Sequence, residues 1–168
     1  MSGTARLGIG FVGAGFITRT FHSDSIQKIR HADVAGIMNP TVSKADSLAE
    51  EMRAADCGDP NTYGDVRELV RDPAVDALWI TSPNYARVET MEMVTEELEQ
   101  GNADLTGVAF EKPLGRNVRE AQRVVELVEQ TGLAHAYLEN RLPLPPVQRM
   151  NDLPWSNGRP AGRPAPPR

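Results

Sequence analysis

The chain has 168 residues, 40% of them apolar and 24% charged, which is the composition of an ordinary globular protein with one well-buried domain. Its formal net charge of −5 argues against a nucleic-acid surface, and the single cysteine, Cys57, excludes an internal disulfide and indicates a reducing compartment such as the cytoplasm. The apolar stretch "LGIGFVGAGF" at 7–16 is too short and glycine-rich for a membrane span, and no metal site is indicated.

Strand and helix patterns alternate along the first 141 residues. Helix patterns run through Ile17, Phe21 and Ile29, and then over 41–52, 65–72, 88–101 and 117–132. Predicted strands cover 7–12, 33–38, a short stretch near 62–63, 75–81, 105–110 and 134–138. This alternation predicts an α/β fold, a doubly wound and mostly parallel sheet of about six strands with helices on both faces.

Composition changes abruptly near Leu142. Residues 142–168 hold 8 of the 13 prolines, four arginines and one aspartate, and they show no apolar periodicity. Such a segment cannot bury a core, so we expect a domain over 1–141 followed by a disordered Pro/Arg-rich tail over 142–168.

The stretch "VGAGFIT" at 12–18 follows the first predicted strand and opens the first helix. Gly13 would permit the tight turn, and Gly15 would let the backbone approach a pyrophosphate, which the helix N-terminus attracts. Thr18 stands at the third glycine position of this dinucleotide fingerprint, so looser helix–strand packing is expected. The alternative is a glycine-rich turn that binds nothing.

The second predicted strand ends at Asn39, where an acid normally holds the adenine ribose. Asn39 can still hydrogen-bond a ribose, and it lacks the charge that would repel a 2′-phosphate, which Ser43 and Lys44 could contact. NAD and NADP therefore both stay open as cofactors. The alternative is that Asn39 only caps the next helix.

Two further polar segments follow strands whose carboxyl ends meet at the same edge of the sheet. "TSPN" at 81–84 should bring Pro83 and Asn84 near the cofactor, with a turn and helix cap as the alternative. "EKP" at 111–113 should aim Glu111 and Lys112 at the nicotinamide half. A lysine there can hydrogen-bond a substrate hydroxyl and help its proton leave. The alternative for this pair is a surface ion pair.

In these pieces the chain resembles the Gfo/Idh/MocA family, the glucose–fructose oxidoreductase and inositol dehydrogenase type. The matching pieces are "GFVGAGF", "DPAVDALWITSPN" and "EKPL", within residues 6–141, the family's N-terminal Rossmann domain. The resemblance implies NAD(P)-dependent hydride transfer to or from a sugar or polyol, with Lys112 as the catalytic lysine; Tyr85 and Arg87 stand where the family often has a histidine. The implied cofactor-binding residues are Gly13, Gly15, Phe16, Ile17, Asn39, Ser82, Pro83, Asn84, Glu111 and Lys112.

Family members continue into an α/β domain that forms the substrate pocket and often supplies a catalytic histidine. The chain stops soon after "YLENR", so we expect that domain to be absent, through a shifted reading frame or a premature end. His22, His31 and His135 do not match that histidine, and His135 is expected in the core or sheet. The alternative to an oxidoreductase domain is a non-catalytic nucleotide-binding module or an inactive fragment, and a homo-oligomer stays open.

Overall fold

The computed structural model describes residues 6–139 and 144–149 of two compact units, 1–138 and 139–168. Most of the tail predicted to be disordered lies outside the described residues; residues 145–149 of it form a short helix. No helix in the described ranges is long and apolar enough to cross a bilayer. The strands are β1 Leu7–Val12, β2 Ala32–Met38, β3 Asn61–Tyr63, β4 Ala77–Ile80, β5 Gly107–Glu111 and β6 Ala134–Leu138. The helical elements are η1 Thr18–His22, α1 Ser23–Ile26, α2 Val42–Ala54, α3 Val66–Val70, η2 Asn84–Ala86, α4 Arg87–Glu99 and α5 Val118–Thr131.

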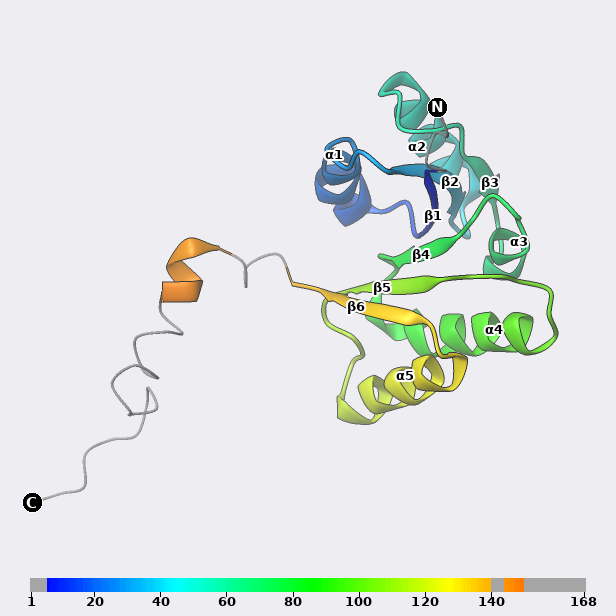
Figure 1. Cartoon of the computed structure of the whole chain (residues 1–168), viewed down its shortest axis with the longest axis vertical. Coiled ribbons are helices and arrows are strands. Elements are labelled where there is room, and N and C mark those ends of the chain that lie inside the picture. The colour runs from blue at the N-terminus through cyan, green and yellow to red at the C-terminus, as the bar shows by residue number, and fades with distance from the viewer. Residues whose placement is uncertain (1–5, 140–143, 150–168) are drawn as a thin grey trace, which may run out of the picture. The chain divides into compact units, whose positions relative to one another are not determined.

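The six strands form one sheet in the order β3-β2-β1-β4-β5-β6, and every pair is parallel (Figure 1). The predicted doubly wound α/β fold is therefore confirmed. The order changes direction at β1, since β2 lies on one side of it and β4 on the other. In open parallel sheets, ligands bind beyond the carboxyl ends of the strands at this switch point.

Apolar clusters on both faces hold the sheet to its helices. On one face α1 and α2 pack over β1 and β2, with Phe11 and Leu48 fully buried between them. On the other face α3, α4 and α5 cover the sheet, with Met91 and Leu127 in that cluster. Each such buried side chain contributes about 1.5–3 kcal/mol of transfer free energy. The two faces together explain why β1 is almost continuously apolar.

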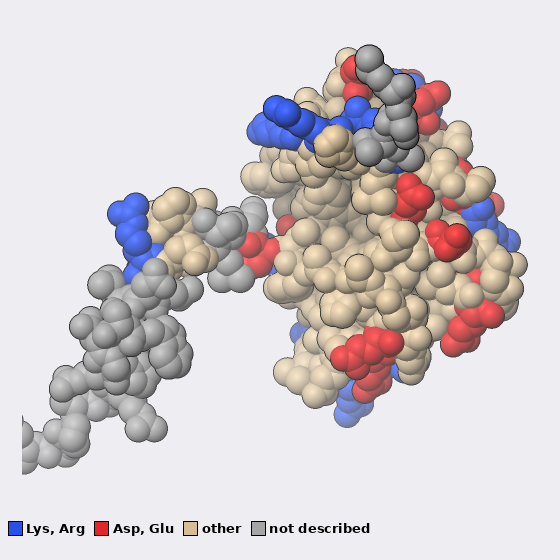
Figure 2. All heavy atoms as spheres, viewed as in Figure 1, with Lys and Arg blue, Asp and Glu red and all other residues tan. Residues whose placement is uncertain are grey.

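The α1–α2 face is not covered by described helices over β4, β5 and β6. Ala134 and Ala136 are exposed there, and a hollow of about 310 Å³ lies beside Trp79. Figure 2 shows a broad, mostly uncharged area on the viewed side of the domain. His135, which was expected in the core or the sheet, is a sheet residue: it lies on the edge strand β6 and is exposed there.

The first helix differs from its predicted amphipathic pattern. The expected apolar stripe is turned outward, with Phe21 48% exposed, while Thr18, His22 and Ile26 face the interior. The cause is the π-helical turn η1, in which Ser23 N–H donates to Thr18 O five residues back. This wider turn changes which residues share a face, so an α-helical period predicts the wrong stripe.

The boundaries of α5 match the predicted helix range 117–132, and a capping residue stands at each end. Asn117 Oδ1 accepts a hydrogen bond from Glu120 N–H at 3.0 Å, and Gly132 closes the helix with a φ of 68°. Glu120 accepts from the backbone of Arg116 rather than Asn117, so the reciprocal bond is shifted by one residue.

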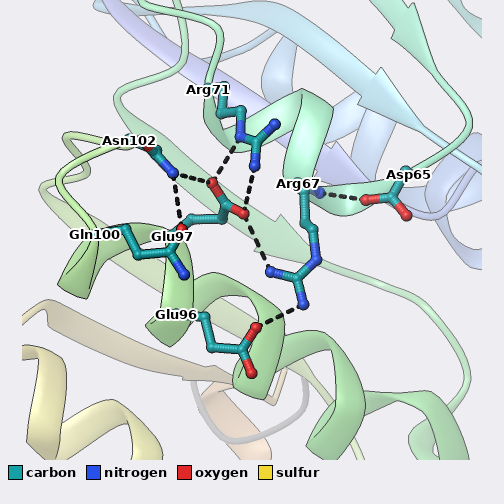
Figure 3. Close-up of polar contacts among 7 residues, drawn as sticks. All are labelled: Asp65, Arg67, Arg71, Glu96, Glu97, Gln100 and Asn102. Atoms are coloured by element: carbon teal, nitrogen blue, oxygen red, sulfur yellow. Dashed lines mark hydrogen bonds and ion pairs between the residues drawn. The ribbon is translucent and has the colours of Figure 1, made fainter.

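A buried carboxylate, Glu97, ties α3 to the far end of α4 (Figure 3). Arg71 donates to both of its oxygens at 2.6 and 2.8 Å, and Arg67 and Asn102 donate at 3.1 Å each. Arg67 also pairs with Glu96 at 2.6 Å. These donors, Arg71 first, lower the pKa of Glu97 to about 2, which keeps its charge fully formed. The cluster lies away from the switch point and acts as a structural clamp.

Candidate functional site

A groove of about 650 Å³ follows the carboxyl edge of the sheet. Its walls come from the segments after β1, β2, β4 and β5, so residues up to 100 positions apart meet in one concave surface. All ten residues implied as a cofactor site line it: Gly13, Gly15, Phe16, Ile17, Asn39, Ser82, Pro83, Asn84, Glu111 and Lys112. Met38, Pro40, Thr41, Thr81 and Pro113 are lining residues that sequence reasoning did not select.

The glycine turn follows β1, and its two glycines differ in backbone conformation and in the space around them. Gly13 has φ of 113°, and a Cβ there would lie 3.0 Å from Ser82 N, so the fold itself requires glycine. A Cβ on Gly15 would meet no protein atom within 4 Å. Because Gly15 lines the groove, the space beside it is open for a ligand that approaches the backbone closely.

Thr18 replaces the fingerprint's third glycine without the expected crowding. Its side chain is fully buried, and Oγ1 donates to Gly13 O at 2.8 Å while lying 2.7 Å from Thr81 Oγ1. Thr81 is also within hydrogen-bond distance of Val12 O and Gly13 O. The prediction of looser packing is wrong, because the two hydroxyls connect the ends of β1 and β4 to the helix.

Asn39 braces the glycine turn. Its Oδ1 accepts from Ala14 N–H at 3.2 Å, and its Nδ2 donates to Thr41 O at 3.0 Å. The helix cap alternative is wrong, because the N-cap of α2 is Thr41. At this end of the groove Lys44 is a lining residue, whereas Ser43 is not. Glu111, at the opposite end, is the only carboxylate among the described lining residues.

The segment after β4 supplies polar atoms from the middle of the groove. Ser82 is buried, and its Oγ has no hydrogen-bond partner among the described residues. Asn84 begins η2 and donates to Gly115 O at 3.4 Å, which links this segment to the loop after β5. Asn84 caps neither η2 nor α4, so the helix cap alternative is wrong.

The segment after β5 separates its two charges. Glu111 is buried, and one of its carboxylate oxygens accepts from the Lys112 backbone N–H. Lys112 is exposed, and no ion pair joins its ammonium to Glu111 or to any other described residue. The surface ion pair alternative is therefore wrong. The peptide bond between Lys112 and Pro113 is cis.

A buried guanidinium, that of Arg87 on α4, supports the turn at Lys112 and Pro113. It donates to Pro113 O and, at 3.3 Å, to Ser82 O, and so holds the ends of β4 and β5 together. Burial lowers the pKa of Arg87, and the nearby Glu111 charge opposes that effect. This role of Arg87 could not be predicted from its position near "TSPN", because the fold brings both carbonyl partners to it.

A buried histidine, His22, reaches the same carboxylate from η1. Its Nε2 lies 3.6 Å from Glu111 Oε1, and its ring meets Trp79 edge-on with centroids 5.1 Å apart. Burial lowers the pKa of His22, with Glu111 acting in the opposite direction, so the ring is neutral at pH 7. Sequence reasoning missed this contact because 89 positions separate the two residues.

Comparison with known proteins identifies the domain. Residues 7–137 match the model of the Gfo/Idh/MocA family, described as an oxidoreductase family with an NAD-binding Rossmann fold. An uncharacterized protein of Saccharomyces cerevisiae is 28% identical over 143 residues, which are 84% of this chain and 38% of that protein.

Two solved structures share the fold. An NAD-binding oxidoreductase from Klebsiella pneumoniae has a TM-score of 0.67 and 25% identity over 92% of this chain and 40% of that chain. The myo-inositol dehydrogenase from Lactobacillus casei, solved with NAD(H) and myo-inositol, has a TM-score of 0.74 and 18% identity over 90% of this chain and 42% of that chain. The chain thus spans less than half the length of these relatives. The match over 7–137 shows that the chain belongs to the Gfo/Idh/MocA oxidoreductase family and carries its NAD-binding Rossmann domain.

Proposed function

We propose that the groove binds NAD or NADP and that the domain serves hydride transfer between the nicotinamide and a secondary alcohol or carbonyl of a sugar or polyol. The observation that carries this is the meeting of all ten implied residues in one groove at the switch point of the sheet. Membership of the family supports the cofactor, and the inositol bound by one structural relative supports the substrate class.

The sheet order supports one direction for the bound dinucleotide. Asn39 and Lys44 follow β2, the glycine turn follows β1, and Glu111 and Lys112 follow β5 on the other side. A pyrophosphate over Gly15 therefore places the adenosine toward Lys44 and the nicotinamide toward Lys112. The open space beside Gly15 fits a phosphate that approaches backbone N–H groups.

The residues at the β5 end have separate tasks in this proposal. The bound nicotinamide would supply the hydride acceptor or donor. Lys112 would hydrogen-bond the substrate oxygen through its exposed ammonium and help a proton move to or from it. Glu111 would hold the Lys112 backbone, and Arg87 would hold the following Pro113 carbonyl.

We further propose that NADP is accepted at least as well as NAD. Both polar atoms of the Asn39 amide are engaged with backbone, and no described carboxylate lines the adenosine end to repel a 2′-phosphate. Lys44 lines that end and supplies a positive charge. Asn39→Asp keeps the acceptor for Ala14 N–H but adds a charge. Repulsion of about 1–4 kcal/mol at ~4 Å should shift the NADH-to-NADPH affinity ratio at least roughly fivefold toward NADH.

Titration calorimetry of the full chain with NADH and NADPH tests the proposal. Lys44→Ala should weaken NADPH binding and leave NADH binding unchanged. Lys112→Ala at the opposite end should change the NADH and NADPH affinities by the same factor, because it does not face the 2′-phosphate. Absence of NADH and NADPH binding by the wild type at millimolar concentration would refute the cofactor site.

Turnover is tested separately, with a panel of sugars and polyols and absorbance of the reduced nicotinamide as the signal. Any wild-type rate should be lost in Lys112→Ala and kept in Lys44→Ala with NAD. Cofactor binding with no turnover on the whole panel would favour the non-catalytic alternative for this chain.

A further inference from the structure

The Glu111 carboxylate is approached from two elements on opposite sides. One oxygen accepts from the Lys112 backbone N–H, and the other lies 3.6 Å from His22 Nε2. The side chains of His22 and Glu111 are each only 10% exposed. His22 belongs to the helix that begins at the glycine turn, so this contact joins the phosphate end of the groove to the turn that carries Lys112.

The surroundings of His22 leave Glu111 as its evident partner. Its Nε2 is buried without a hydrogen-bond partner among the described residues, and the Trp79 ring blocks motion on one side. At 3.6 Å the pair is beyond hydrogen-bond length, and a shift of roughly 0.6 Å would close it. An unpaired buried donor is costly, so closing this gap is favourable.

The charges around the carboxylate explain why a neutral donor suits the position. Arg87 already faces Glu111 from α4 and offsets its charge, while Lys112 follows it on the chain. Trp79 on β4 is uncharged. A neutral imidazole N–H can therefore orient the carboxylate without adding a second positive charge beside the buried Arg87.

We propose that His22 is a positioning residue which, through the Glu111 carboxylate, fixes the Lys112 turn at the nicotinamide end of the groove. The inference rests on the proposed function, which identifies the ligand of the groove as a nicotinamide dinucleotide. His22 itself touches neither cofactor nor substrate. Removing its N–H should loosen the nicotinamide end of the groove and leave the adenosine end intact.

The first test needs no ligand. In a ¹⁵N-labelled full chain, NMR should show the Lys112 backbone amide shifting with the same midpoint as the His22 ring, below about pH 6.5. That step should disappear in His22→Gln and persist in His135→Gln, whose side chain is exposed on β6. A Lys112 amide that shows no step at the midpoint of the His22 ring would overturn the proposal, because simple packing of His22 on Trp79 predicts that result.

The second test compares NADH with ADP-ribose, which lacks the nicotinamide. His22→Phe keeps a ring against Trp79 and removes the N–H. It should weaken NADH binding by roughly threefold to tenfold and leave ADP-ribose binding unchanged. His22→Gln retains an N–H donor and should recover most of the loss. Equal NADH affinity in His22→Phe and wild type would overturn the positioning role. Failure of the wild type to bind NADH would instead overturn the proposed function, and the amide titration would still decide the inference.

Discussion

The two glycines of the turn after β1 should respond in opposite ways to substitution by alanine. Gly15→Ala places a methyl group where the structure has open space, and φ at Gly15 lies outside the positive range that favours glycine. Gly→Ala at such a position stabilises a protein by about 0.4–1 kcal/mol. Gly13→Ala forces an L side chain to adopt a φ of 113° with its Cβ 3.0 Å from Ser82 N. The strain alone should cost about 1–3 kcal/mol.

These magnitudes translate into separable measurements. For a chain of this size about 1 kcal/mol changes the Tm by roughly 2–4 °C, so Gly13→Ala should melt roughly 2–12 °C lower and Gly15→Ala slightly higher. If a phosphate lies over Gly15, the methyl group displaces it from one charge-assisted hydrogen bond of about 1.5–3 kcal/mol. NADH affinity measured by calorimetry should then fall roughly 10- to 100-fold in Gly15→Ala. Wild-type affinity in this variant would refute a pyrophosphate over Gly15.

Three further substitutions test interactions that hold the domain together. Glu97→Gln should flatten the dependence of Tm on pH in acid. The Glu97 carboxyl, with a pKa of about 2 in the fold, stabilises the fold fully above about pH 4.5 and loses that contribution as pH falls toward 2. A wild-type Tm that is constant between pH 5 and 2.5 would contradict this. Thr18→Val should lower stability by about 1 kcal/mol, since Thr81 still donates to Gly13 O. Thr95→Val is its control and should be neutral or stabilising, because Thr95 Oγ1 is buried without a partner among the described residues. Asn117→Ala should cost about 1 kcal/mol by removing the cap of α5, and unchanged urea denaturation would argue against that bond.

The sequence predicted the parts of the fold that depend on local patterns. β1 and β6 match their predicted ranges, and Asn117 and Gly132 bound α5 because capping depends on neighbouring residues. The first helix failed in register, because Thr18 is buried by hydrogen bonds to Gly13 O and Thr81, which the apolar period does not reveal.

The same distinction applies to the groove. Its lining could be predicted, since strand ends in a parallel sheet share an edge and strand ends are visible in sequence. The roles of individual amides could not. Asn39 and Asn84 were expected near the cofactor, with a helix cap as the alternative for each, and their amides bond to the backbone of other segments, at Ala14 and Gly115. The contact between His22 and Glu111 could not be predicted for the same reason, since only the folded sheet brings the two residues together.

The pairing of β1 with β4 has a thermodynamic consequence. These two adjacent strands join the half of the sheet that contains β1–β3 to the half that contains β4–β6, and residues of both halves line the groove. A ligand bound along its whole length therefore contacts both halves and binds only when they are docked. Its binding free energy adds to the cooperativity of folding, by about 2.7 kcal/mol at a hundredfold excess over Kd. The cellular concentration of such a ligand would then set how often the two halves separate.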